Sequence, residues 1–262
     1  MIKRVHPARI VARVFGLAIA LGTLVLSLPI SRTANNFGGF LEAAFTSVSA
    51  VCVTGLSTVD VPTYWTPFGH LVILLMIKVG GFGIITFALF LGILLARRIG
   101  LNTRMVGSAE MPGMDGGNPK RLILKLFIAT SLFEFIVATF ITCRLWLGYG
   151  YDLPEAIWYG IFHAVSAFNN AGFALYSDSL MSFAADGWML MPLNFAVIIG
   201  GLGFPVLFEL GRRIIGRVKA SQVGGVIESA LHWTLSTRLV LWSTLILLTF
   251  GTLYFAFIEW NN

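Results

Sequence analysis

The sequence predicts an all-α integral membrane protein built from repeated units, each a membrane span, a re-entrant pore loop and a second span. Three observations predict this class. Of the 262 residues, 57% are hydrophobic and only 11% are charged, whereas soluble domains carry about 25% charged residues. Basic residues gather in alternate loops. Two motifs recur in the same order: the stretch that begins at Phe45 returns at Phe162, and Gly80-Gly-Phe-Gly83 returns at Gly200.

The basic clusters predict the orientation of the chain. They comprise Lys3, Arg4, Arg9 and Arg13, then Arg97, Arg98, Arg104, Lys120, Arg121 and Lys125, and finally Arg212, Arg213, Arg217 and Lys219. Basic residues mark cytoplasmic loops, so we expect a multi-pass protein of the cell membrane, surrounded by lipid, with its N-terminus in the cytoplasm. The same distribution argues against nucleic acid as the partner of the net charge of +6.

The opposite loops are mainly acidic. They carry Glu42, Asp60, Asp152, Glu155, Asp178, Asp186 and Glu259, against Arg32 and Arg144. An acidic outer mouth raises the local concentration of cations, although scattered acids on wet loops explain any single residue equally well.

The apolar runs predict five transmembrane helices. They run from the basic start to about Ile30, from Phe68 to about Ala96, from Leu122 to about Leu147, from Trp188 to Leu210, and from Leu235 to about Ile258. The first run is longer than the apolar core of a cleaved signal peptide, about 7–15 residues, so it is interpreted as an uncleaved span. The predicted units are 1–118, 119–220 and 221–262, the last being the opening span of an incomplete third repeat.

Two shorter segments are predicted to be pore helices. Gly38–Cys52 and Pro154–Phe168 are too short to cross a hydrocarbon core about 30 Å thick at 1.5 Å per residue. Each is followed by sequence that is not evidently helical, and such backbone is tolerated at membrane depth only beside protein or a water-filled cavity. Residues 60–67 are predicted to be an interfacial return loop.

The residues after each short helix suit a cation filter made of backbone carbonyls. Carbonyls bind a desolvated monovalent cation without fixed charge, so the ion can leave again. Glycine permits the torsions that aim neighbouring carbonyls together, and the helix C-terminus adds partial negative charge. The candidate K⁺ ligands are the carbonyls of Val53, Thr54, Gly55, Asn170, Ala171 and Gly172. Cys52 and Asn169 belong either to this filter or to the ends of the pore helices.

Lys78 and Glu134 are ionisable residues inside predicted spans, where such groups are functional candidates. Lys78 either lines the inner pore and repels cations, or reaches toward an acid such as Glu134. The two GGxG segments are interpreted as packing and bending elements, because small residues let helices approach closely.

The sequence argues against an enzyme. Neither Ser49 nor Ser166 lies in a GxSxG elbow, and no HExxH motif occurs. His163 is a lone histidine, interpreted as structural rather than metal-binding. Cys52 and Cys143 are expected to be small buried thiols. No glycine-rich phosphate loop follows a strand, so we expect no cofactor and no nucleotide bound by this chain itself.

SAVCVTGLSTVD, the GGFG span, FHAVSAFNNAGFAL and the GGLGFPV span resemble the Trk/Ktr/HKT superfamily of potassium transporters, most closely the N-terminal part of a Ktr-type membrane subunit. The resemblance covers nearly the whole chain. It implies four span–loop–span units around one pore, potassium uptake (with sodium in some members), and one filter glycine per unit, at Gly55 and Gly172 here. It also implies a dimer of membrane subunits docked on a cytoplasmic nucleotide-binding regulatory ring.

The sequence departs from that family because the third loop and the fourth unit are missing. The gating loop of the third unit and the positive residue of the fourth therefore correspond to no residue here. Either the chain is a fragment, or complete pores form from two or more copies. The alternative function is a truncated, non-conducting structural or assembly partner that needs another chain to complete the pore. An intramembrane enzyme is a distant third.

Overall fold

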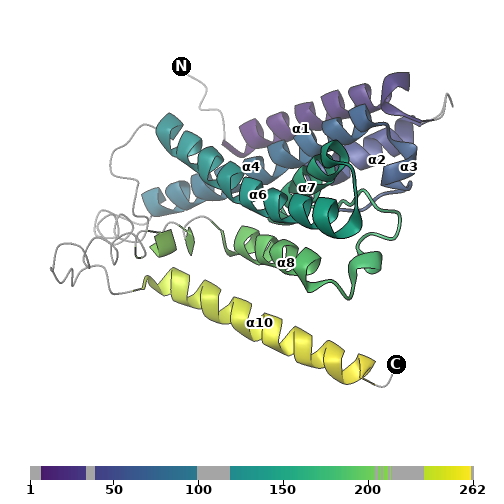
Figure 1. Ribbon diagram of the computed structural model, residues 1–262. Helices are drawn as coiled ribbons and strands as arrows, with labels where there is room; N and C mark the ends of the chain where they lie inside the picture. The colour runs from purple at the N-terminus through teal and green to yellow at the C-terminus, as the bar shows by residue number, and fades with distance from the viewer. Residues whose placement is uncertain are drawn as a thin grey trace, which may run out of the picture. The chain divides into compact units, whose positions relative to one another are not determined.

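The structure is a computed structural model that describes residues 7–33, 39–98, 119–203, 206–207, 209–211, 213 and 233–260 (Figure 1). For residues 7–11, 84–98, 119–123 and 125 it describes the helical backbone alone. Within these ranges the chain is mainly helical, and extended pairing is limited to one bridge between Arg32 and Trp65. The expectation of an all-α protein is therefore confirmed.

Most helices agree closely with the apolar runs of the sequence. The exception is the run Trp188–Leu210, whose helix ends at Leu202 because Gly203 is left-handed, with φ of 79°. The helices are α1 (Pro7–Leu26), the 3₁₀ turn η1 (Pro29–Ser31), α2 (Phe40–Val51), α3 (Val61–Tyr64), α4 (Pro67–Arg98), α6 (Pro119–Tyr149), α7 (Leu153–Phe168), η2 (Met181–Phe183), α8 (Gly187–Leu202) and α10 (Leu235–Glu259). The predicted pore helices correspond to α2 and α7. Pro154 lies in the first turn of α7, where a missing N–H is tolerated.

Parts of several predicted segments lie outside the described residues. They are Lys3 and Arg4, Gly38 at the start of the first predicted pore helix, Arg104 with the rest of residues 99–118, and Arg217 and Lys219 within residues 214–232.

The chain divides into two compact units. One comprises Met1–Leu91 with Ile123–Gly201, and the other comprises Gly92–Leu122 with Leu202–Asn262. The first unit contains α2, α7 and the segments that follow them, so both predicted pore loops belong to one compact body. The predicted boundaries at 118/119 and 220/221 stay predictions.

In the first unit, α1 packs against α2 and α4 through Gly22. A Cβ atom placed on Gly22 would lie 2.1 Å from the sulfur of Met76 and 3.2 Å from the hydroxyl of Ser47. The core beside this crossing includes fully buried Leu26, Ile73 and Ile77. Small residues at a crossing let helices approach without a hydrophobic driving force, which is how helices pack in lipid.

α7 is held against α6 by a similar contact. A Cβ on Gly160 would lie 2.3 Å from the Thr142 hydroxyl and 2.8 Å from the Ala138 carbonyl. The same Thr142 hydroxyl donates a 3.2 Å hydrogen bond to the Ala156 carbonyl. These contacts hold the first half of α7 against α6.

The described helices differ in whether they are long enough to cross a membrane. Two stretches of the described helices, Leu126–Tyr149 in α6 and Leu235–Glu259, are long and apolar enough to cross a membrane. The apolar stretches described in α1, α4 and α8 are shorter: Ala12–Leu26, Pro67–Gly83 and Gly187–Leu202. Large apolar side chains such as Leu147 and Phe257 are 73% and 83% exposed, as expected for surfaces that face lipid or protein. The count of five spans stays a prediction.

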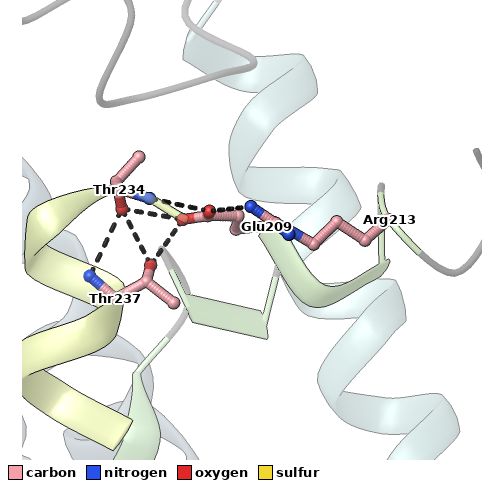
Figure 2. A network of polar contacts seen from close by, with 4 residues as sticks. All are labelled: Glu209, Arg213, Thr234 and Thr237. Carbon is pink, nitrogen blue, oxygen red and sulfur yellow. Dashed lines mark hydrogen bonds and ion pairs between the residues drawn. The ribbon is translucent and has the colours of Figure 1, made fainter. Parts of the chain in front are cut away.

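In the second unit, a buried carboxylate organises the start of α10 (Figure 2). Glu209, only 4% exposed, accepts hydrogen bonds from the backbone N–H and hydroxyl of Thr234 at 3.0 and 2.7 Å. It also accepts bonds from the Thr237 hydroxyl and from Arg213. Thr234 is the N-cap residue, and its hydroxyl accepts from Thr237 N at 3.2 Å.

Replacing Thr234 with alanine is expected to lower the free energy of unfolding by about 1–2 kcal/mol, because the cap is lost and one hydrogen bond to buried Glu209 goes with it. Thermal unfolding of the purified protein in detergent measures the change. Ser236→Ala is the matched control, since Ser236 is an exposed hydroxyl in the same helical turn. Equal stability of the two variants would contradict this role of Thr234.

Candidate functional site

The two predicted pore helices end in the same backbone conformation. Their C-cap residues have φ/ψ of −84°/0° at Cys52 and −82°/1° at Asn169. The next residues are left-handed, with φ of 55° at Val53 and 56° at Asn170. Left-handed residues commonly end helices, although the position rarely suits a β-branched residue such as valine.

The hydrogen bonds that close the two ends are equivalent, one by one. They run from Cys52 N to Val48 O (2.8 Å), Val53 N to Ala50 O (3.3 Å) and Thr54 N to Ser49 O (2.9 Å), and from Asn169 N to Val165 O (3.1 Å), Asn170 N to Ala167 O (3.0 Å) and Ala171 N to Ser166 O (2.7 Å). The bond that spans five residues is the mark of a Schellman motif. The register inferred from sequence therefore holds at the level of individual backbone bonds.

Two residues beyond each left-handed residue the chain reaches a glycine that is also left-handed. Gly55 has φ of 72° and Gly172 has φ of 73°. A single left-handed residue other than glycine costs about 1–3 kcal/mol. Each loop therefore contains two positions with torsions that most residues resist. The strained torsion of Val53 is maintained by the backbone hydrogen bonds on either side of it.

The two loops lie against each other at these glycines. A Cβ on Gly55 would lie 2.5 Å from the Ala171 carbonyl oxygen and 3.0 Å from the Gly172 Cα, and a Cβ on Gly172 would lie 3.3 Å from the Gly55 Cα. Beyond the glycines a second pair of equivalent positions meets: Asp60 accepts a 2.7 Å hydrogen bond from Ser177. Asp60 also accepts from Thr63 at 2.6 Å.

Side chains of α7 hold the second loop behind the glycine. The Ser166 hydroxyl donates to the Phe173 carbonyl at 2.6 Å. The His163 Nε2 accepts from the Leu175 N–H at 3.2 Å, and its Nδ1 donates to the Tyr159 carbonyl at 2.8 Å. Hence buried His163 carries its proton on Nδ1 and links the helix to the returning chain.

The first loop is braced differently. The Thr54 hydroxyl donates to the Ser49 hydroxyl at 2.9 Å. Thr46 is the position equivalent to His163, and its buried hydroxyl has no hydrogen-bond partner among the residues that the structure describes. The sequence argued against Ser49 and Ser166 as nucleophiles and predicted a structural role for His163. It missed which backbone groups they hold, although the 117-residue register aligns Thr46 with His163.

The GGxG segments lie directly against the ends of the two short helices. A Cβ on Gly80 would lie 2.1 Å from the Val51 carbonyl oxygen, and a Cβ on Gly200 would lie 1.8 Å from the Phe168 carbonyl oxygen. Val51 and Phe168 are themselves equivalent positions, the last residues of α2 and α7. The repeated glycines therefore give each pore helix end a contact with the backbone of the following long helix.

Lys78 and Glu134, the two ionisable residues of the predicted spans, lie beside each other. Lys78 on α4 forms an ion pair with Glu134 on α6, and the Lys78 ammonium lies 5.5 Å from the centre of the Phe127 ring. The side chain of Glu134 is 6% exposed and that of Lys78 is 25% exposed. The second oxygen of Glu134 accepts a 3.1 Å hydrogen bond from the Asn169 amide, at the end of α7.

A second ion pair joins α6 and α8 at the far end of the unit. Arg144 Nε donates to Asp186 at 2.7 Å, and the Tyr149 hydroxyl donates to the same oxygen at 2.9 Å. The other oxygen accepts from the N–H of Trp188 at 3.0 Å. The Arg144 hydrogen bond holds the pKa of the Asp186 carboxyl below its ordinary value.

A lowered pKa in the folded state makes Asp186 stabilising above the pKa of the unfolded chain, about 3.9. That contribution is lost as the pH falls through the folded-state value. We expect Asp186→Asn to lower the melting temperature at pH 7 and to match the parent more closely near pH 3. Thermal unfolding at the two pH values measures this. A difference of the same size at both values would show that the carboxylate charge is not involved.

Other expected sites fare as follows. Among the described residues, no group of three or more His, Cys, Asp or Glu side chains is placed to hold a metal ion. Cys52 and Cys143 are free and exposed, so the expectation that both thiols are buried is wrong. Cys52 ends a helix beside the loop, and Cys143 lies on an outward face of α6.

Comparison with known proteins decides the family. Residues 14–261 match the family described as TrkH, cation transport protein. The chain belongs to the TrkH family. It is 36% identical over 259 residues to the Ktr system potassium uptake protein B of Bacillus subtilis (strain 168), covering 99% of this chain and 54% of that protein.

Two further relatives also match nearly the whole of this chain and about half of their own length. It is 29% identical to the potassium/sodium uptake protein NtpJ of Enterococcus hirae, covering 99% of this chain and 54% of the relative. It is 31% identical to the Ktr system potassium uptake protein B of Vibrio alginolyticus, covering 91% and 49%. The chain spans about half the length of these TrkH relatives. Their names describe uptake proteins and not enzymes, in agreement with the sequence.

Proposed function

We propose that this chain contributes two of the loops that form a potassium-selective pore for potassium uptake across the cell membrane. The ions move passively, or nearly so, through a filter of backbone carbonyls. Val53, Thr54 and Gly55 supply the ligands of the first loop, and Asn170, Ala171 and Gly172 those of the second. Potassium is the transported ion, with sodium carried to a lesser extent, and no cofactor takes part in this chain.

The observation that carries the proposal is the contact between the two loops at Gly55 and Gly172. Two copies of one position, related by a rotation, can touch only where both lie close to the rotation axis. Asp60 and Ser177, which are also equivalent positions, are hydrogen-bonded. Both contacts support a pseudo-symmetry axis that runs past the glycines, where a shared ion path belongs.

Electrostatics supports the same assignment. α2 and α7 both end beside the glycines, and the C-terminus of a helix carries roughly half an elementary negative charge. Two such ends stabilise a cation without a carboxylate that would bind it too tightly to leave. Because the loops differ in sequence at Val53-Thr54 and Asn170-Ala171, we expect a preference for potassium that is softer than that of a filter with four identical loops.

The surroundings follow from the proposal. The protein is multi-pass in the cell membrane, in contact with lipid, with five spans, two re-entrant pore loops and a cytoplasmic N-terminus. The names of the Ktr system relatives support a partner subunit. We propose a second copy of the membrane subunit and a cytoplasmic nucleotide-binding regulatory ring.

A second candidate function is a structural or assembly partner that does not conduct alone. The observation that favours it is that the described residues hold two such loops, whereas a pore on a fourfold axis needs four. On this alternative, other loops must be supplied before ions pass.

Radiotracer uptake separates the candidates. Residues 1–262 alone are reconstituted in liposomes. The assembled transporter, defined as this chain together with the additional loops that complete its pore, is reconstituted in parallel. Potassium uptake by the assembled transporter, inhibited weakly by sodium, is expected. Uptake by residues 1–262 alone excludes the non-conducting alternative. An assembled transporter that takes up no potassium contradicts the proposed function.

A further inference from the structure

The pair of Lys78 and Glu134 joins two predicted repeats immediately behind the second loop. Lys78 lies on the returning helix of the first repeat and Glu134 on the opening helix of the second. Glu134 is buried, and both of its oxygens are used: one by Lys78 and one by the Asn169 amide. A buried carboxylate is tolerated when it is paired and hydrogen-bonded in this way.

Asn169 is the residue through which this pair reaches the loop. Its amide nitrogen also donates a 2.9 Å hydrogen bond to the Val165 carbonyl in the last turn of α7. The next residue, Asn170, is the left-handed one that begins the candidate filter. Any movement of the Asn169 side chain therefore acts on the helix end and on the torsions of the loop together.

The other side of Asn169 is equally confined. A Cβ on Gly81 would lie 2.0 Å from the Asn169 Oδ1, so any side chain at this point of α4 would displace the Asn169 amide. Lys78 and Gly81 are three residues apart on one helix, and both lie against groups of the second repeat. The amide is thus held between α4 on one side and the Glu134 carboxylate on the other.

The first loop has no counterpart of this arrangement. The position equivalent to Asn169 is Cys52, which is exposed and has no amide group. The bracing therefore acts on the second loop alone, whose residues Asn170 and Ala171 differ in type from Val53 and Thr54.

We propose that Lys78 and Glu134 are positioning residues that hold Asn169, and with it the second loop, in the ion-selective geometry. This inference rests on the proposed function. It differs from a role for Lys78 as a pore-lining charge that repels cations. In the positioning role the geometry of the filter depends on the contact between the two side chains and not on the net charge of the pair.

The two roles predict opposite results for a pair of substitutions. Lys78→Met leaves the Glu134 carboxylate buried without its counter-ion, and Glu134→Gln leaves the ammonium unpaired, so each single change is expected to disturb Asn169. In the double variant both charges are gone, and the glutamine amide oxygen still accepts from Asn169. We therefore expect the double variant to recover what each single variant loses.

The experiment measures potassium and sodium uptake by the assembled transporter in liposomes. Each single variant should lower the potassium-to-sodium ratio about fivefold or more, and the double variant should return within about twofold of the parent. Asn169→Ala should lower the ratio as well, and adding Glu134→Gln to it should have no further effect. Arg144→Met with Asp186→Asn is the matched control: it removes the other ion pair of α6 and should reduce thermal stability with the ratio unchanged.

Several results would overturn the inference. If Lys78→Met raises the rate of potassium uptake and the double variant keeps that rise, Lys78 acts as a pore charge. If the single variants lose stability but keep the parental ratio, the pair is structural only. If the single effects simply add in the double variant, the two side chains do not act as a unit. A parent that takes up no potassium overturns both this inference and the proposed function, whereas a selective parent with unaffected variants overturns the inference alone.

Discussion

Replacing Gly55 with serine is expected to lower the preference of the assembled transporter for potassium over sodium by about tenfold. A non-glycine residue at φ of 72° costs about 1–2 kcal/mol, and a tenfold change in an equilibrium corresponds to about 1.4 kcal/mol. The added Cβ would also lie 2.5 Å from the Ala171 carbonyl oxygen. One substitution therefore displaces candidate ligands of both loops.

The chain contains a matched control for this change. Gly150 has the same φ of 72°, but no atom lies within 4 Å of a Cβ placed on it. Gly150→Ser carries a similar backbone strain, so it should reduce stability without changing the ratio of potassium to sodium uptake. Competitive tracer uptake measures the ratio for both variants. If Gly55→Ser retains the parental ratio, Gly55 is not part of the filter.

Gly172 tests the same assignment from the other loop. Its φ is 73°, and a Cβ would lie 3.3 Å from the Gly55 Cα. Gly172→Asp adds a carboxylate beside the proposed ion path, so we expect it to weaken potassium preference too, with the ion held more tightly and released more slowly. Gly172→Ser is the substitution that matches Gly55→Ser in chemistry, so unequal effects of these two serine variants would report the unequal bracing of the two loops.

The second large effect is expected from Gly200→Ala, which should prevent normal folding. In an exposed helix this change stabilises by about 1 kcal/mol. Here the new methyl group would lie 1.8 Å from the Phe168 carbonyl oxygen and 2.9 Å from its carbon. Neither atom belongs to a flexible side chain, so α7 and α8 must separate. We expect a loss of at least about 3 kcal/mol, seen as a collapse in the yield of folded protein and in its melting temperature.

Gly80→Ala should behave in the same way, because its Cβ would lie 2.1 Å from the Val51 carbonyl oxygen. Gly16→Ala in α1 and Gly251→Ala in α10 are the controls, since nothing lies within 4 Å of a Cβ at either position. These two variants should fold as well as the parent or better. If Gly200→Ala folds as readily as the controls, the close contact between α8 and the end of α7 does not exist in solution.

The backbone plan could be predicted from sequence because it depends on length and repetition. Apolar runs set most helices to within a few residues, but the end of the run Trp188–Leu210 was missed because the helix ends at Leu202, before Gly203. The short helices were evident because fifteen residues do not cross a bilayer. The equivalence of Gly55 and Gly172 was evident from the repeated sequence motif, and the hydrogen bonds of the two loops agree with it. Local signals of this kind need no knowledge of distant contacts.

Other features could not be predicted in the same way. The left-handed torsion of Val53 opposes the preference of a β-branched residue, so tertiary contacts decide it. That Lys78 meets Glu134 was one of two interpretations, because the sequence does not say which helix faces are adjacent. The sequence assigned Asn169 either to the filter or to the end of a pore helix. In the structure its amide nitrogen donates to Glu134 and to the Val165 carbonyl at the end of α7. The exposure of Cys52 and Cys143 follows from a surface that faces lipid or protein, where apolar neighbours in sequence do not imply burial.

The hydrogen bond between Asp60 and Ser177 bears on how such a chain can arise from duplication. Had the two halves stayed identical, this place would bring two carboxylates together, or two hydroxyls, and two carboxylates in one site repel each other. An acceptor on one side and a donor on the other resolve the conflict. The contact therefore favours halves that differ in sequence, because each half then pairs better with the other half than with a copy of itself. Such halves assemble in a defined order when they are joined in one polypeptide.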